Sequence, residues 1–134
     1  MQSATEPKNP RPLSPHLQVY KPQISTVLSI THRMTGVALT FGMVVMIAWL
    51  ASVAGGPENY ANFVQYAHSI IGQIILLGLS LSFFFHLCLG IRHLFWDAGY
   101  FLDLPDVYKT GRIAIGAAVI LTLIVWLKIY GVSL

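Results

Sequence analysis

One histidine stands inside a run of residues that is otherwise suited to hydrocarbon. The stretch "FFFHLCLGIRHLFWDAGY", residues 83–100, carries His86 in its apolar half, and Arg92, His93 and Asp97 follow at helical intervals. An ionisable side chain inside a membrane segment suggests a functional site, because a neutral imidazole needs a hydrogen-bond partner there and a charged one is costly. An imidazole nitrogen is a good axial ligand of haem iron, and a bundle interior suits the apolar macrocycle. His86 is therefore a candidate haem ligand; a packed histidine bonded to a neighbouring carbonyl is the alternative.

The chain is not expected to complete a six-coordinate haem alone. His86 and His93 are seven residues apart, which separates them by about 10 Å along a helix, so they cannot both bind one iron. His68, at the opposite end of the second apolar run, and His32, at the membrane interface, are not expected at the depth of His86. The second ligand is therefore expected from another subunit. Arg92, His93 and His32 are better suited to meet the negative propionates.

A second polar cluster, "SITHR", stands at the start of the first apolar run. Ser29, His32 and Arg33 are at positions i, i+3 and i+4, so they share one face of a helix. A hydroxyl, an imidazole and a guanidinium at this depth predict a small polar pocket at the edge of the membrane. The alternative is that they only mark the interface, as basic residues at helix ends often do.

The composition favours a membrane protein. Of the 134 residues, 55% are hydrophobic and 10% are charged, whereas a soluble domain has a charged share near a quarter. The net charge is +3, but the Lys and Arg residues lie near the ends of apolar segments rather than in one patch, which excludes nucleic-acid binding. Cys88 is the only cysteine, so it cannot form an internal disulfide and is interpreted as a small packing residue.

Three apolar runs are long enough to cross a bilayer, which needs roughly 20 helical residues. They predict an all-α membrane protein with transmembrane helices over about residues 29–54, 66–95 and 111–131, which together form a transmembrane domain over residues 29–134. Residues 1–28 contain five of the seven prolines and predict an extended, Pro-rich N-terminal arm. No cleavable signal is evident, since this opening is polar.

Lysine and arginine in the short flanking segments predict the orientation. The N-terminal flank and the second connecting segment carry these residues, while the first connecting segment, "GGPENYANFVQYAH", has none. The basic residues are Lys8, Arg11, Lys21 and Arg33 in the N-terminal flank, and Arg92, Lys109 and Arg112 around the second connection. By the positive-inside rule, the N-terminus and the second connection lie inside and the C-terminus lies outside. Both polar clusters are then at the same face of the membrane.

Three motifs together resemble a known family. The segments "RPLSPHLQVY", "SITHRMTG" and "HLCLGIRHLFWDAGY", in this order on a three-helix chain, resemble the large cytochrome b anchor subunit of succinate dehydrogenase, respiratory complex II. The motifs cover residues 11 to about 100, and the topology matches over the whole chain. The arm and the "WDAGY" ending are more similar to the mitochondrial and alphaproteobacterial branch. A Met1 start without a transit peptide favours the bacterial cytoplasmic membrane over the mitochondrial inner membrane.

The resemblance implies a role for each matching residue. His86 is an axial ligand of haem b, whose other ligand comes from a second, smaller anchor subunit. Ser29 and Arg33 help to form the ubiquinone pocket. The residues expected near a haem propionate or as polar support of the two sites are His32, Arg92, His93 and Asp97.

The resemblance also implies partners and a reaction. A flavoprotein subunit oxidises succinate, and an iron–sulfur subunit passes the electrons to ubiquinone at the inner membrane face, so this chain has no expected activity alone and tethers the soluble subunits to the phospholipid bilayer. A fumarate reductase anchor that uses menaquinone and a purely structural anchor are the alternatives. A transporter is disfavoured because the polar groups gather at one face and do not line a path across the membrane.

Overall fold

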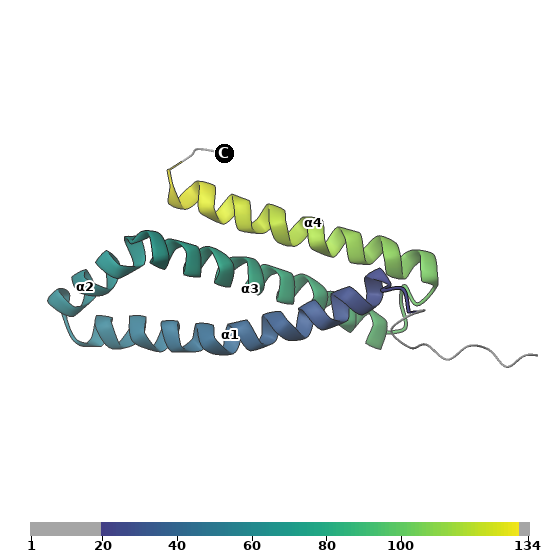
Figure 1. Ribbon diagram of the computed structural model, residues 1–134, viewed down its shortest axis with the longest axis horizontal. Coiled ribbons are helices and arrows are strands. Elements are labelled where there is room, and N and C mark those ends of the chain that lie inside the picture. The colour runs from purple at the N-terminus through teal and green to yellow at the C-terminus, as the bar shows by residue number, and fades with distance from the viewer. Residues whose placement is uncertain (1–19, 132–134) are drawn as a thin grey trace, which may run out of the picture.

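The computed structural model describes residues 20–131 (Figure 1). The helices within this range are α1 (Ile24–Ala54), α2 (Pro57–His68), α3 (Ile70–Asp97) and α4 (Leu104–Ile129). Helices α1, α3 and α4 are long and apolar enough to cross a membrane, which confirms the predicted all-α fold with three such helices. Most of the predicted N-terminal arm, residues 1–19, lies outside the described residues. The last part of that arm is helical, because α1 begins at Ile24 rather than at residue 29.

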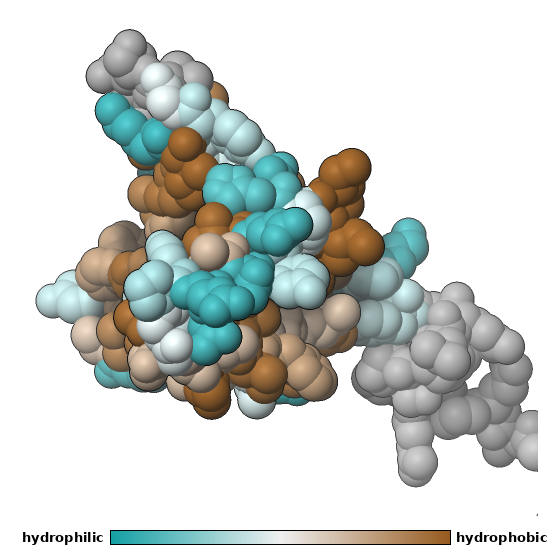
Figure 2. All heavy atoms as spheres, turned by 90° about the vertical axis from the view of Figure 1, so that its left-hand side faces the viewer, coloured by the Kyte–Doolittle hydropathy of each residue, from teal (hydrophilic) through white to brown (hydrophobic). Residues whose placement is uncertain are grey.

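Helix α3 lies between α1 and α4, and neighbouring long helices run in opposite directions (Figure 1). The start of α1, the end of α3 and the start of α4 therefore meet at one end of the bundle, which we call the basic end. Its cationic side chains are Lys21, Arg33, Arg92, Lys109 and Arg112. The opposite end carries α2, and hydrophilic side chains gather near its middle with apolar atoms around them (Figure 2). The two polar clusters of the sequence are thus at the same end, as predicted.

The connection between α1 and α3 contains a helix that the sequence analysis treated as a loop. Gly56 separates α1 from α2 with a φ of 94°, a left-handed conformation that favours glycine. Pro57 then occupies the first turn of α2, where its missing N–H costs nothing, and Glu58 suits the positive end of the helix dipole. A helix of 12 residues is too short to span the membrane, and the search for membrane-length apolar runs therefore missed it.

Small side chains allow the helices to approach closely on one side of α4. The buried residues of this helix are Gly111, Ala114, Ala118 and Thr122. Ala118 has no exposed surface, and Ala114 packs with Leu28 of α1 and Leu89 of α3 in the apolar core. Lipid tails are as apolar as leucine, so helix association in a membrane depends on such close packing rather than on hydrophobic burial. The small-residue face of α4 therefore holds α4 against α3 and α1.

Replacing Gly111 with alanine should loosen this packing. A Cβ at Gly111 would lie 2.7 Å from Cδ1 of Leu28, so Gly111→Ala should destabilise the bundle by about 1–3 kcal/mol through overpacking. The measurement is the thermal denaturation midpoint of the purified complex in detergent. Gly116→Ala is the matched control on the same helix, because nothing lies within 4 Å of a Cβ there. Equal loss of stability in both variants would contradict the packing assigned to Gly111.

Candidate functional site

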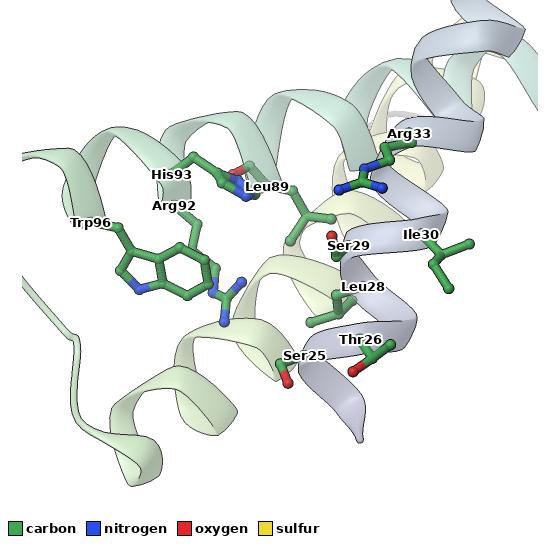
Figure 3. Close-up of a pocket in the computed structure, with 10 residues that line it drawn as sticks. All are labelled: Ser25, Thr26, Leu28, Ser29, Ile30, Arg33, Leu89, Arg92, His93 and Trp96. Atoms are coloured by element: carbon green, nitrogen blue, oxygen red, sulfur yellow. The ribbon is translucent and has the colours of Figure 1, made fainter. Parts of the chain in front are cut away.

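A cleft of about 530 Å³ opens between α1 and α3 at the basic end, and we call it the polar cleft (Figure 3). Helix α1 contributes Ser25, Thr26, Leu28, Ser29, Ile30 and Arg33, and α3 contributes Leu89, Arg92, His93 and Trp96. The guanidinium of Arg33 extends across the opening toward α3, whereas Ile30 points away from α3. The antiparallel arrangement of the two helices thus brings Ser29 and Arg33 of one predicted cluster next to Arg92 and His93 of the other.

Arg92 links α3 to α4 by hydrogen bonds. It is only 6% exposed, and its guanidinium donates from Nε to Oγ1 of Thr110 at 3.0 Å and from Nη2 to the carbonyl oxygen of Val107 at 2.8 Å. The same guanidinium lies 3.8 Å from the centre of the Trp96 ring, a favourable cation–π distance. Arg92 therefore fastens the end of α3 to the start of α4. Its expected contact with a propionate stays a prediction.

Trp96 forms one wall of the polar cleft, and the sequence analysis did not select it. Its indole Nε1 donates to the carbonyl oxygen of Phe101 at 3.1 Å, which folds the α3–α4 connection back onto the ring. Phe101 takes a φ of 59° and Gly99 a φ of 83° to make this turn. The available signal was the spacing: Trp96 follows Arg92 by four residues and therefore shares its helix face.

Asp97, by contrast, does not line the polar cleft. It is the last residue of α3 and its side chain is exposed. The support that it was expected to give the quinone site stays a prediction. The neighbouring residue His93 does line the cleft, and its Nδ1 lies 2.7 Å from the carbonyl oxygen of Leu89.

Three imidazole rings stack where α1 crosses α3. The ring of His32 lies between those of His86 and His93, with centroid separations of 4.0 Å and 5.0 Å and interplanar angles of 20° and 16°. His32 therefore lies beside His86, although it was not expected at the depth of His86. The expectation considered each helix separately, whereas the antiparallel crossing places His32 beside the turns of α3 between residues 86 and 93. Within residues 20–131, the buried Nε2 atom of His32 has no hydrogen-bond partner.

The hydrogen bonds of His86 determine which ring nitrogen carries the proton. Its Nδ1 lies 3.2 Å from the carbonyl oxygen of His32 and 3.2 Å from Oγ1 of Thr35. The Thr35 hydroxyl donates to the same carbonyl at 2.7 Å. Because a carbonyl oxygen only accepts, this network assigns the proton to Nδ1 of His86. The lone pair on Nε2 is then available to a metal.

A glycine on α1 makes room for the His86 ring. A Cβ added at Gly36 would lie 3.2 Å from Cε1 of His86, so a larger residue would displace the imidazole. Gly90, four residues after His86 on α3, has nothing within 4 Å of its Cβ position. The residue that lets the ring approach the neighbouring helix is therefore Gly36, which a search along α3 alone does not find.

A larger apolar cleft of about 880 Å³ begins at His86 and continues between α1 and α3 toward α2. We call it the apolar cleft. Its walls are formed by Gly36, Leu39, Thr40, Gly42, Met43, Val45, Met46 and Trp49 of α1, Phe63 of α2, Leu76, Leu79, Ser80, Phe83, Phe84 and His86 of α3, and Val125 of α4. In the part of the chain that the structure describes, no group of three or more His, Cys, Asp and Glu side chains is arranged to hold a metal ion. His86 could thus serve as a single metal ligand at the edge of an apolar space.

Comparison with known proteins identifies the family of the chain. Residues 7–125 match the family described as succinate dehydrogenase/fumarate reductase transmembrane subunit. The chain belongs to this family. It is 46% identical over 118 residues to the succinate dehydrogenase cytochrome b556 subunit of Rickettsia felis, covering 88% of this chain and 92% of that protein. It is 41% identical over 114 residues to the cytochrome b556 subunit of Paracoccus denitrificans, covering 85% and 88% of the two chains.

A third relative is a cytochrome b560 subunit. The chain is 42% identical over 123 residues to the succinate dehydrogenase cytochrome b560 subunit of Reclinomonas americana, covering 87% of this chain and 85% of that protein. These relatives confirm the resemblance found in the sequence motifs. The two clefts therefore belong to a member of a family of membrane-embedded subunits.

Replacing Arg92 with lysine should weaken the tie between α3 and α4. A lysine keeps the charge but cannot reproduce the forked contacts to Thr110 and Val107, so Arg92→Lys should cost about 1.5–3 kcal/mol, as for hydrogen bonds of a charged group. The measurement is the thermal denaturation midpoint of the purified complex. Arg112→Lys on α4 is the control, because Arg112 is exposed. An unchanged midpoint in Arg92→Lys would show that these hydrogen bonds do not stabilise the bundle.

Proposed function

We propose that this chain is the haem b-binding membrane anchor of a succinate dehydrogenase (succinate:ubiquinone oxidoreductase) and forms part of its ubiquinone-reduction site. The observation that carries the proposal is the position of His32 between His86, at the edge of the apolar cleft, and His93, at the edge of the polar cleft. Two spaces of different chemistry thus lie side by side along one helix crossing. This is the arrangement that a redox centre next to a quinone site requires.

The residues around the apolar cleft suit a haem. His86 offers an unprotonated Nε2, and the cleft walls are mostly apolar, as the body of a porphyrin requires. The buried Nε2 of His32, which has no hydrogen-bond partner among residues 20–131, is available to a propionate. The ring of His93 stacks on that of His32 and is a second candidate for such a contact. A haem bound here supplies a centre that accepts and returns one electron. The second axial ligand would come from the smaller anchor subunit, since His32 and His93 stack on His86 rather than oppose it.

The polar cleft suits the head of a quinone. Ser29 offers a hydroxyl that can donate to a quinone carbonyl, and Arg33 offers a permanent positive charge that stabilises negative charge developing on that oxygen. Trp96 is a cleft residue whose indole gives a flat ring apolar contact. Because the cleft is at the end of the bundle, a ring entering from lipid can reach it while the protons for its reduction arrive from water.

The distribution of cations supports an orientation with the basic end inside. The N-terminus and the α3–α4 connection then face the cytoplasm of a bacterium, and α2 and the C-terminus face the other side. The iron–sulfur subunit would dock at the basic end, next to the polar cleft, with the flavoprotein subunit beyond it. The exposed apolar side chains of Tyr100 and Leu102 in the α3–α4 connection offer contact area for such a partner.

A fumarate reductase anchor is the second candidate, because the family description covers both enzymes. The names of the relatives favour succinate dehydrogenase. The two assignments share the tethering function and the membrane topology. They differ in the quinone and in the direction of electron flow.

Replacing His86 should remove the proposed axial ligand. In His86→Leu, the reduced-minus-oxidised absorption spectrum of the purified complex should lose or shift its haem bands, because leucine cannot bind iron. His68→Leu is the control, since His68 ends α2 at the opposite end of the bundle, and its spectrum should match the wild type. A His86→Leu complex that keeps an unchanged bis-imidazole spectrum would refute the assignment.

Replacing Ser29 or Arg33 should impair quinone reduction selectively. Loss of one hydrogen bond to a charged or developing charged group costs about 1.5–3 kcal/mol, or roughly 10- to 150-fold in rate. Ser29→Ala and Arg33→Gln should therefore slow succinate-to-ubiquinone electron transfer while succinate-to-dye transfer in the soluble subunits persists. Arg112→Gln is the control for the loss of one exposed cation at the basic end. Equal loss of both activities in the Ser29 and Arg33 variants would indicate failed assembly instead of a quinone-site role.

A further inference from the structure

Thr35 differs from Thr31 and Thr40, which lie on the same helix. Thr31 and Thr40 donate to the carbonyl oxygens of Val27 and Gly36, four residues earlier in each case, as threonines in helices commonly do. Thr35 is only 9% exposed, donates instead to the carbonyl oxygen of His32, and also lies 3.2 Å from a ring nitrogen on another helix. Its hydroxyl therefore joins the backbone of α1 to the imidazole of His86.

We propose that Thr35 is a positioning residue for His86, which fixes the tautomer of the imidazole and increases the electron donation of its Nε2 to a bound haem iron. This inference rests on the proposed function, because it requires His86 to be the axial ligand. It assigns to Thr35 a role that the motif residues Ser29, His32 and Arg33 do not have. The juxtaposition that carries it is one hydroxyl shared between the His32 carbonyl and the His86 Nδ1.

The direction of each hydrogen bond follows from the available protons. The single hydroxyl proton of Thr35 is used on the His32 carbonyl at 2.7 Å, so Oγ1 presents a lone pair to Nδ1 of His86. The proton on Nδ1 then has two acceptors, the hydroxyl oxygen and the carbonyl oxygen, each at 3.2 Å. Donation by the hydroxyl also increases the negative charge on its oxygen, since connected hydrogen bonds polarise one another. Because its only hydroxyl proton is donated to the backbone, Thr35 can meet the imidazole only as a hydrogen-bond acceptor.

Packing holds the ring where this bond can form. Gly36, the next residue of α1, allows Cε1 of His86 to approach the helix backbone. The ring of His32, one turn earlier on α1, stacks on that of His86 at 4.0 Å. The imidazole is therefore packed against both Gly36 and His32, and its rotation is restricted.

The electronic consequence is a lower haem reduction potential. An acceptor for the Nδ1 proton makes the imidazole a stronger donor through Nε2, as partners of metal-bound histidines do. A stronger donor stabilises the more highly charged ferric iron relative to the ferrous state. Removal of the Thr35 hydroxyl should therefore shift the haem midpoint potential in the positive direction.

The experiment compares four variants of the intact complex by redox titration of the haem bands and by the low-spin ferric electron paramagnetic resonance spectrum. Thr35→Val removes the hydroxyl with nearly the same volume, and a positive shift of the midpoint potential with altered resonance positions is expected. Thr35→Ser keeps the hydroxyl and should restore the wild-type values. The pair Thr35→Ser and Thr35→Ala, which have similar volumes and differ by the hydroxyl, gives the same comparison if the valine variant does not assemble.

Thr31→Val is the matched control, because it removes a hydroxyl that bonds only to its own helix, and its potential and spectrum should match the wild type. Loss of haem in Thr35→Val or Thr35→Ala, with retention in Thr35→Ser, would also support the positioning role. The same potential and spectrum in Thr35→Ala, Thr35→Ser and the wild type would overturn it. A wild-type complex without haem, or with haem unaffected by His86→Leu, would instead refute the proposed function itself.

Discussion

The crossing of α1 and α3 is the contact on which both clefts depend. At this crossing the ring of His32 stacks on His86 at 4.0 Å and on His93 at 5.0 Å, and the carbonyl oxygen of His32 accepts from the neighbouring helix. A buried imidazole without partners is costly in hydrocarbon, so the three rings stabilise one register of the two helices. A shift by one helical turn would break the hydrogen bond of His86 and separate the walls of the polar cleft.

Helix α4 keeps this crossing in place without contributing a ring to it. Its small residues allow Ala114 to pack against Leu89 and Leu28, which both line the polar cleft. Arg92 holds the end of α3 against the start of α4 by its hydrogen bonds to Thr110 and Val107. Arg92, which was expected near a haem propionate, is thus turned toward α4, while Arg33 stays open to the cleft. Burial and partners distinguish the two arginines, although their sequence contexts are similar.

The sequence was sufficient for properties that depend on one segment and insufficient for those that depend on two. The lengths of the apolar runs predicted three membrane helices, and the shared face of Ser29, His32 and Arg33 predicted a polar pocket, whose residues Ser29 and Arg33 line the polar cleft. The depth of His32 and the role of Gly36 were missed because both are set by which turn of α1 meets which turn of α3. Helix α2 was missed because its polar sequence carries no membrane-length signal; its start depends on local effects at Gly56 and Pro57.

The change in side-chain character along the crossing explains how two spaces of opposite polarity can be neighbours. Toward α2 the walls are apolar and belong mostly to helices that are long and apolar enough to cross a membrane; a charge interacts strongly where water is excluded. Toward the basic end the walls include the hydroxyl of Ser29 and the exposed guanidinium of Arg33. His32 is at the boundary, and its buried Nε2, which has no hydrogen-bond partner among residues 20–131, is a polar atom that an anionic group could satisfy there. A cofactor with an apolar body and acidic substituents matches this boundary, because each part of it would meet the side of the crossing that suits its polarity.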